Sequence, residues 1–254
     1  MNVAIVYVYA PAAGVNCENY LFRFLKSYND FPPGVEHETI VVLNGARATS
    51  EITCLFSSLT NCSFIEHDNS GYDIGAFQCA AKCYPCDMMV FFGSSTYFQW
   101  AGWLSRMKSV FLKYGNAQYG AMGNRGNVSV GVWPHIRTTA FWMNPKLMND
   151  CPNRVTRPDQ RHPFEHGKDC FTEWVKSQGL NSWVVTRTQE LLWKDWDNSI
   201  NGYSKGNQSN MLAGDRMTER PYFKSNQCGH PAARGQFCYP WTTENCWECL
   251  SVHP

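Results

Sequence analysis

The order of apolar and polar positions predicts strands that alternate with helices. Apolar runs with the length of buried strands occupy 3–9, 39–43, 63–67 and 88–92. Segments with apolar residues at helical spacing occupy 19–28, 75–82 and 100–114. This alternation predicts an α/β fold in which helices flank a mostly parallel central sheet on both faces.

The pattern loosens after Gly115. Further strands are expected at 119–122, 137–143 and 182–186, and one helix at 164–178. From about Leu191 onward Gly, Asn, Ser, Trp and Pro dominate, which predicts long loops. We therefore expect one α/β domain over residues 1–190, with a loop-rich segment and a Cys-rich tail over 191–254 packed on it.

Composition and charge restrict the class of protein. The chain has 254 residues, of which 44% are hydrophobic, as in an ordinary globular core. Its formal charge of +1 comes from 22 basic and 21 acidic residues with no basic stripe, so nucleic acid is not an expected partner. No run approaches the roughly 18 apolar residues of a membrane span, and the first ten residues suit a buried strand better than a signal peptide. These features favour a cytoplasmic protein without a transmembrane segment.

The twelve cysteines fall into two groups and a scattered background. The first group, Cys79, Cys83 and Cys86, lies at the end of a predicted helix, where simple packing is expected. The second group lies in the tail and consists of Cys228, Cys238, Cys246 and Cys249. A Cys-x2-Cys pair with two further thiols is compatible with structural zinc, while free thiols or disulfides are the alternatives.

The segment 67–76 places a carboxamide, a carboxylate and two glycines where a predicted strand leads into a predicted helix. Nucleotides and their phosphates are usually held at this edge of an α/β sheet. Asn69 and Asp73 are therefore candidate ligand-binding residues. The alternative is that they are turn and N-cap residues and that Gly71 supplies a positive φ angle.

An ordered set of motifs resembles a known family. The set comprises a first strand at the N-terminus, a second strand that ends in Asn44-Gly45, the segment 69–76, and the strand that ends in Gly93-Ser94-Ser95. It resembles nucleotide-sugar-dependent glycosyltransferases of the GT-A fold, and looks most like their rhamnan-synthesis and polysaccharide-associated branches. The resemblance covers roughly residues 1–186. It implies a GT-A-like sheet, a nucleotide-sugar donor, and a glycan or other hydroxyl acceptor.

The resemblance implies roles for several residues. Tyr9 and Asn44 would lie near the nucleoside, while Asn69 and Asp73 would bind the base, ribose or sugar. An ionised carboxylate only accepts hydrogen bonds, so Asp73 suits hydroxyl groups better than phosphate.

The chain departs from the family at Ser94 and Ser95, where many GT-A enzymes carry an Asp-x-Asp pair. That pair holds a divalent cation, Mn²⁺ or Mg²⁺, which offsets the charge of the leaving diphosphate. Hydroxyls are poor sole ligands for such a cation. The dependence on Mn²⁺ or Mg²⁺ is therefore open, and basic side chains or backbone N–H groups are the alternative.

A catalytic base is expected on the far side of the donor. Related enzymes keep an acidic residue at the start of the helix predicted at 164–178, so Glu165 is the candidate base and Asp169 the reserve candidate. The alternative is that Glu165 is a first-turn residue favoured by the helix dipole. His166 is assigned to the acceptor side or the lid, with a surface or capping role as its alternative.

Two further clusters complete the candidate site. Trp133, His135 and Arg137 suit the donor diphosphate or an acceptor sugar, with Arg137 as the expected phosphate contact. Asp195 and Asp197 lie in a segment that resembles a lid and could replace the missing metal pair, although a solvated loop is the commoner fate of such residues.

Three function classes follow. The leading one is a glycosyltransferase that moves a sugar from a nucleotide-sugar donor to a hydroxyl acceptor. The second is a carbohydrate- or nucleotide-binding module of the same fold that has lost the chemistry. A nucleotidyltransferase is disfavoured, because no Gly-rich loop with a lysine follows the first strand.

Overall fold

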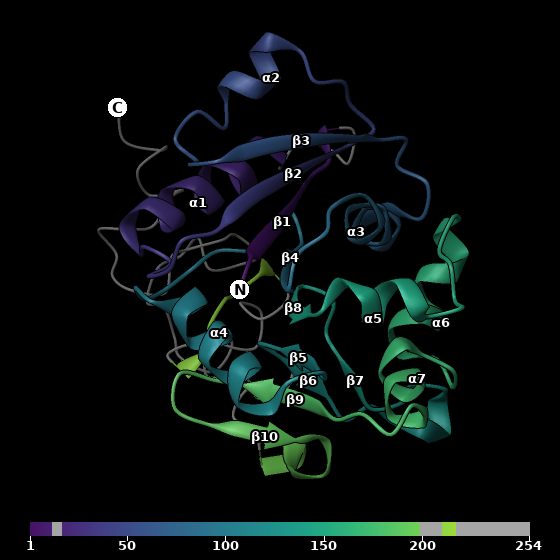
Figure 1. Cartoon of the computed structure of the whole chain (residues 1–254). Helices are drawn as coiled ribbons and strands as arrows, with labels where there is room; N and C mark the ends of the chain where they lie inside the picture. The colour runs from purple at the N-terminus through teal and green to yellow at the C-terminus, as the bar shows by residue number, and fades with distance from the viewer. Residues whose placement is uncertain (12–16, 199–209, 217–254) are drawn as a thin grey trace, which may run out of the picture.

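The protein is built around one large sheet, seen in a computed structural model that describes residues 1–11, 17–198 and 210–216 (Figure 1). The eight strands follow the order β10-β9-β5-β8-β4-β1-β2-β3. They are β1 (Val3–Tyr9), β2 (Glu38–Asn44), β3 (Cys62–His67), β4 (Met88–Phe92), β5 (Gln118–Gly120), β8 (Ala140–Met143), β9 (Ser182–Val185) and β10 (Glu190–Leu192). A small second sheet pairs β6 (Gly123–Asn124) with β7 (His135–Ile136).

The half of the sheet that contains β3, β2, β1 and β4 is entirely parallel. All seven residues of β1 are buried, which explains why its sequence is a continuous apolar run. Strand β8 runs antiparallel between β4 and β5, and β9 returns parallel to β5. The predicted α/β class, with a mostly parallel sheet flanked by helices, is confirmed.

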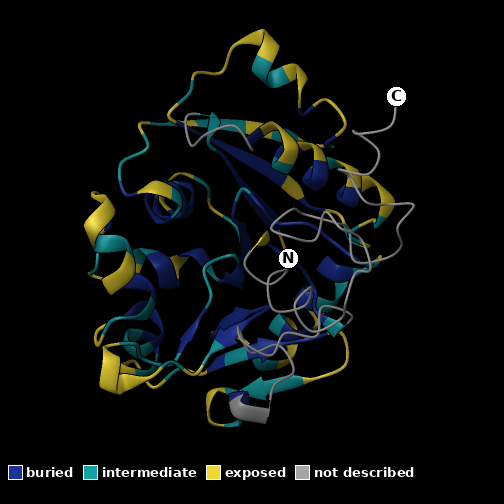
Figure 2. Ribbon diagram, turned by 180° about the vertical axis from the view of Figure 1, so that it is seen from behind, coloured by how far each residue is buried: buried dark blue, intermediate teal, exposed yellow. Residues whose placement is uncertain are grey.

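Helices cover both faces of the sheet and create two apolar cores (Figure 1). Helices α1 (Cys17–Asp30) and α4 (Trp103–Tyr114) pack on one face. The other face is covered by α3 (Tyr72–Cys83), α5 (Pro145–Asp150), α6 (Arg161–His166) and α7 (Phe171–Ser177). Figure 2 shows the inner strands, such as β1 and β4, as the buried layer, whereas the edge strands β3 and β10 and helix α2 (Ser50–Cys54) have no buried residue.

Two predicted elements differ in the structure. The single helix expected at 164–178 is wrong: α6 ends at His166, and α7 begins only at Phe171. Gly167 ends α6 in an extended conformation, and an added Cβ there would lie 2.8 Å from the Pro163 carbonyl oxygen. The strand expected at 137–143 begins only at Ala140, because 137–139 forms an irregular connection after β7.

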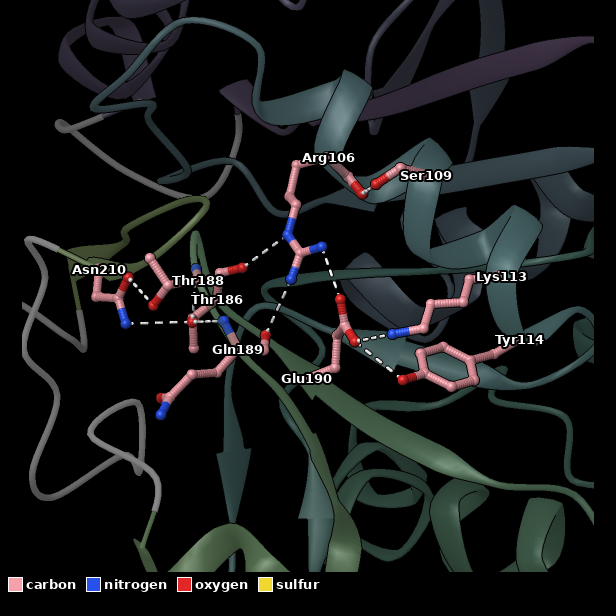
Figure 3. A network of polar contacts seen from close by, with 9 residues as sticks. All are labelled: Arg106, Ser109, Lys113, Tyr114, Thr186, Thr188, Gln189, Glu190 and Asn210. Atoms are coloured by element: carbon pink, nitrogen blue, oxygen red, sulfur yellow. Dashed lines mark hydrogen bonds and ion pairs between the residues drawn. The ribbon is translucent and has the colours of Figure 1, made fainter.

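The edge strand β10 is tied to α4 by a polar network (Figure 3). Glu190 accepts hydrogen bonds from Arg106 at 2.7 Å, Lys113 at 2.7 Å and Tyr114 at 2.9 Å. Burial of the Glu190 carboxyl works against its ionisation, but these three donors outweigh it and lower its pKa to about 2. The antiparallel edge of the sheet is therefore held by charge as well as by its short hydrogen-bond ladder.

Membrane and cysteine predictions can be compared with the described part of the chain. None of its helices has the length and apolarity of a bilayer-spanning segment. Its eight cysteines are free thiols, and α3 ends at Cys83, one residue beyond the predicted helical segment. The possible zinc ligands Cys228, Cys238, Cys246 and Cys249 lie outside the described residues.

Candidate active site

A cavity of about 400 Å³ opens at the carboxyl ends of β1, β2 and β4. The sheet order places β2 and β3 on one side of β1 and β4 on the other, so this is a switch point at which α/β sheets commonly bind ligands. The described side chains and backbone around it come from eight segments: Val8, Ala10, Cys17, Tyr20, Asn44, Asn69, Tyr72, Asp73, Gly93, Ser94, Ser95, Arg137, Thr138, Thr139, Arg161, Glu165, Asp215 and Arg216.

The end of β4 forms a fixed part of the cavity wall. The Tyr7 hydroxyl donates to the Ser94 carbonyl oxygen at 2.9 Å, and the buried Arg23 guanidinium donates to the Ser95 carbonyl oxygen at 2.9 Å. Arg23 also lies 4.2 Å from the ring centre of Tyr97. Ser94 and Ser95 therefore line the cavity as predicted, and hydrogen bonds from Tyr7 and Arg23 hold their backbone in place.

Two carboxamides reach the same cavity from β2 and from the β3–α3 loop. Asn44 is buried, and its Oδ1 lies 2.7 Å from Nδ1 of His67. Burial lowers the pKa of His67, which favours a neutral ring beside this carboxamide. Asn69 adopts a left-handed conformation with φ of 67°. The structure thus brings both asparagines to the cavity.

Asp73 lies in the first turn of α3 and faces the cavity. Its Oδ1 accepts a hydrogen bond from the Ile74 N–H at 3.1 Å, so it does satisfy one N–H of the helix start. Burial raises the pKa of Asp73 above its usual range, Arg161 lowers it, and the nearby Glu165 raises it. Asp73 can therefore combine helix capping with ligand binding.

Glu165 lies on α6, in the same helical layer as α3, and only 7% of it is exposed. Its Oε1 accepts hydrogen bonds from the Thr138 N–H at 3.3 Å and the Thr138 hydroxyl at 3.0 Å, and lies 3.9 Å from an Arg137 guanidinium nitrogen. Burial would raise the pKa of Glu165, but Arg137, His135 and Thr138 together lower it. The carboxyl is therefore ionised at neutral pH.

The predicted position of Glu165 at the start of a helix is wrong, both as the reason for choosing it as the base and as its first-turn alternative. It occupies the last turn of the six-residue helix α6, where the dipole disfavours an anion. Contacts from the 137–139 connection hold the carboxylate instead. This arrangement is what a proton acceptor requires, because the ionised form is kept in place without a proton.

Cationic side chains also line the cavity. Arg137 was predicted there, whereas Arg161 and Arg216 were not. Arg161 lies four residues before Glu165 on α6, so helical spacing could have indicated it. Three guanidiniums from separate segments form a suitable surface for a diphosphate group.

Asp215 is a further residue that the sequence did not indicate. It is 3% exposed, and its Oδ2 accepts a hydrogen bond from the Thr139 hydroxyl at 2.9 Å. A backbone pairing between Tyr97 and Gly214 brings this segment to the cavity, and an added Cβ at Gly214 would meet the Tyr97 ring at 2.6 Å. No local sequence signal predicts such a long-range contact.

Several predicted site residues do not line the cavity. Tyr9 is buried in the core against Phe56, while its neighbours Val8 and Ala10 reach the cavity. Asp169 is exposed between α6 and α7, and Asp195 lies on the turn η4 (Trp193–Asn198). The side chain of Asp197 lies outside the described residues.

The cluster of Trp133, His135 and His166 does not line the cavity. His135 is 1% exposed, its Nδ1–H donates to the Trp133 carbonyl oxygen at 2.7 Å, and burial lowers its pKa to about 4. Burial also lowers the pKa of His166, whose ring centre lies 5.5 Å from that of His135. Of this cluster and Arg137, only Arg137 is among the lining residues.

The end of β4 in the cavity wall carries hydroxyl groups. Hydroxyls of Ser94 and Ser95 occupy the end of β4, and no three His, Cys, Asp or Glu side chains gather as metal ligands in the described ranges. The carboxylates of Asp73 and Glu165 have Arg161 and Arg137 as neighbours.

No protein-family model and no curated protein sequence matches this chain. Solved structures with a similar backbone include S. aureus TarS in complex with UDP-GlcNAc, at 18% identity and a TM-score of 0.42 over 59% of this chain and 47% of that chain. Pyrobaculum calidifontis PcManGT, a mannosyltransferase with GDP-Man and Mn²⁺, matches at 10% identity and a TM-score of 0.44 over 58% of this chain and 46% of that chain.

Mouse xyloside xylosyltransferase 1 matches at 10% identity and a TM-score of 0.45 over 71% of this chain and 82% of that chain. The chain spans about half the length of the TarS and PcManGT chains, and 30% of a longer TarS chain. All of these proteins are glycosyltransferases by name or by the donor in their complexes, but at these TM-scores any functional conclusion depends on the cavity itself.

Proposed function

We propose that this chain is a glycosyltransferase of GT-A-like fold that transfers a sugar from a nucleotide-sugar donor to a hydroxyl group of a glycan or other acceptor. The observation that carries the proposal is the buried, ionised Glu165 on the wall of a cavity that also presents Asp73, two carboxamides and three arginines. A cavity of about 400 Å³ lies within the usual size range of small-molecule sites.

The donor would be held through complementary groups. Asn44, Asn69 and Asp73 offer hydrogen bonds to the base and to ribose or sugar hydroxyls. Arg137, Arg161 and Arg216 offer bidentate hydrogen bonds and positive charge to the diphosphate. These guanidiniums would stabilise the charge that develops on the leaving group.

Glu165 would act as the general base. As the acceptor oxygen attacks the anomeric carbon, its proton passes to the Glu165 carboxylate, and the bond between that carbon and the phosphate oxygen breaks with both electrons leaving on the nucleoside diphosphate. Thr138 and Arg137 hold the carboxylate for this transfer. Because the wall keeps its pKa low, Glu165 is a weak base that depends on position more than on basicity.

The test is release of nucleoside diphosphate from a panel of UDP- and GDP-sugars, with and without Mn²⁺. Glu165→Gln keeps the shape of the side chain and removes its basicity, so we expect turnover to fall by about 10²–10⁴-fold while UDP or GDP still binds. Asp169→Asn changes the reserve candidate, which is exposed. Loss of turnover in Asp169→Asn and not in Glu165→Gln would contradict the assignment of the base.

A binding module is the second candidate, and the end of β4 favours it. Ser94 and Ser95 stand where a cation-binding carboxylate pair would assist departure of the diphosphate. A protein of this kind would be stabilised thermally by nucleotides or sugars, yet would release no nucleoside diphosphate from any donor with or without Mn²⁺.

A further inference from the structure

Tyr72 has an unusual conformation at the edge of the candidate site. It lines the cavity, its residue surface is 42% exposed, and its φ angle is 56°. Asn69 and Gly71 on the same loop also have positive φ angles, of 67° and 71°. Asparagine and glycine tolerate this region, whereas for a bulky side chain it is a strained conformation.

The surrounding backbone imposes this conformation. An added Cβ at Gly71 would lie 2.1 Å from the Val155 carbonyl oxygen, and one at Gly75 would lie 1.9 Å from the Ser70 carbonyl oxygen. The Gly75 N–H donates to the Gly71 carbonyl oxygen at 3.1 Å. The loop and the first turn of α3 are thus packed tightly against residue 155 on either side of Tyr72.

Contacts within the described chain do not offset this strain. The Tyr72 side chain has no hydrogen bond, ion pair or ring contact among the described residues. Strain of this kind costs about 1–3 kcal/mol and typically persists where it serves a ligand. The exposed ring on the cavity wall is therefore best explained by a molecule that enters the cavity.

We propose that the Tyr72 ring is a stacking platform for the base of the donor nucleotide. This inference rests on the proposed function, because it assigns a part of the same donor to one wall. The ring is planar and uncharged, as base stacking requires, and it stands between Asn69, whose carboxamide can pair with a base edge, and Asp73, whose carboxylate suits ribose hydroxyls. The guanidiniums that suit the diphosphate come from other segments.

Tyr72→Asn separates a binding role from a structural one. Asparagine tolerates the left-handed region, so we expect Tm to rise by about 2 °C or more as the strain is relieved. Loss of the stacked ring should weaken UDP and GDP binding by about 5- to 100-fold in calorimetry. Tyr72→Phe keeps the ring and should bind both nucleotides within about threefold of the unchanged protein.

Phe22→Asn is the matched control, because Phe22 is 47% exposed on α1 and does not line the cavity. It should leave nucleotide affinity unchanged and should not raise Tm, since asparagine is a poor residue in a helix interior. An unchanged affinity of Tyr72→Asn for UDP and GDP would overturn the proposal, whatever the change in Tm.

Ligands without a base distinguish this proposal from the proposed function. Inorganic pyrophosphate and ribose 5-phosphate should bind Tyr72→Asn as they bind the unchanged protein, and an equal loss for these two ligands would overturn the platform. If UDP or GDP binds through Tyr72 but no donor is turned over, the platform stands and the glycosyltransferase proposal fails. If neither nucleotide binds the unchanged protein, both proposals fail.

Discussion

Glu165 and Asp73 face one cavity, and their surroundings move their pKa values in opposite directions. Burial and the proximity of Glu165 raise the pKa of Asp73 against the effect of Arg161, while Arg137, His135 and Thr138 lower the pKa of Glu165 in spite of its burial. Two carboxyl groups whose pKa values are separated can take different roles in one reaction. This difference supports Asp73 as a ligand-binding group and Glu165 as the proton acceptor.

At the same scale, Gly71 and Gly179 form a matched pair for stability. Their φ angles are 71° and 72°, but an added Cβ would lie 2.1 Å from the Val155 carbonyl oxygen at Gly71 and would meet nothing within 4 Å at Gly179. Gly179→Ala should lower the free energy of unfolding by about 1–2 kcal/mol, and Gly71→Ala by about 3 kcal/mol or more. Urea denaturation measures both, and equal losses would contradict the close contact at Val155.

Among the elements, α6 and the 137–139 connection position the carboxylate of Glu165 in the candidate site. The two hydrogen bonds of Thr138 reach Glu165 from the connection, and Thr139 accepts from the Gly93 N–H at 2.9 Å and donates to Asp215. The connection therefore joins the end of β4, α6 and the segment at 210–216. An irregular stretch between two short strands thus holds three parts of the candidate site in a fixed relation.

The network between α4 and β10 leads to a prediction about pH (Figure 3). The pKa of Glu190 is lowered to about 2 in the folded protein, so its contribution to stability is present above pH of about 4.5 and is lost as pH falls toward 2. Glu190→Gln should lower the free energy of unfolding by about 1–3 kcal/mol at pH 7 and flatten its decline between pH 4.5 and pH 2.

Asp150→Asn is the control for Glu190→Gln. Asp150 pairs with Lys146 on the surface, where the two side chains are 49% and 77% exposed. Such exposed pairs contribute at most about 1 kcal/mol, so Asp150→Asn should leave the pH profile nearly unchanged. A profile that is equally steep in Glu190→Gln and in the unchanged protein would show that the ion-pair network does not govern acid stability.

At the scale of the whole molecule, the candidate site is assembled from segments that are far apart in sequence. The loop at 69–73, the connection at 137–139 and the segment at 210–216 meet only because the sheet and its two helical layers are formed. Binding in the cavity should therefore stabilise all of these segments together.

Hydrogen exchange tests this joint effect. With UDP or GDP at about ten times its Kd, exchange limited by local opening should slow by about tenfold in the three segments 69–76, 137–139 and 210–216. Exchange in β10 and α4 should change little, because neither element lines the cavity. Protection of only one of the three segments would contradict a shared site.

The fold could be predicted where local pattern determines structure. Buried parallel strands are continuous apolar runs, and the bounds of β1 and β4 agree with those predicted. The helix at 164–178 could not be predicted correctly, because its apolar spacing continues across the break that Gly167 introduces.

The candidate site could be predicted in part, for a similar reason. Asn44, Asp73 and Ser95 follow strands of a parallel sheet, so chain order alone places them at one edge. Asp215 reaches the cavity through the pairing of Tyr97 with Gly214, which no short-range pattern encodes. Tyr9 was misplaced because successive side chains of a strand point to opposite faces, so Val8 and Ala10 reach the cavity instead.

The balance of charge around the cavity has a kinetic consequence. Arg137, Arg161 and Arg216 stand against Asp73, Glu165 and Asp215, so the lining formed by the described residues carries as many guanidiniums as carboxyl groups. Such a surface has strong fields at contact distance and a weak field beyond the Debye length, which is about 8 Å at physiological ionic strength. An anionic nucleotide would therefore be recognised by short-range contacts within the cavity, without long-range electrostatic steering. Its association rate constant would depend little on salt concentration.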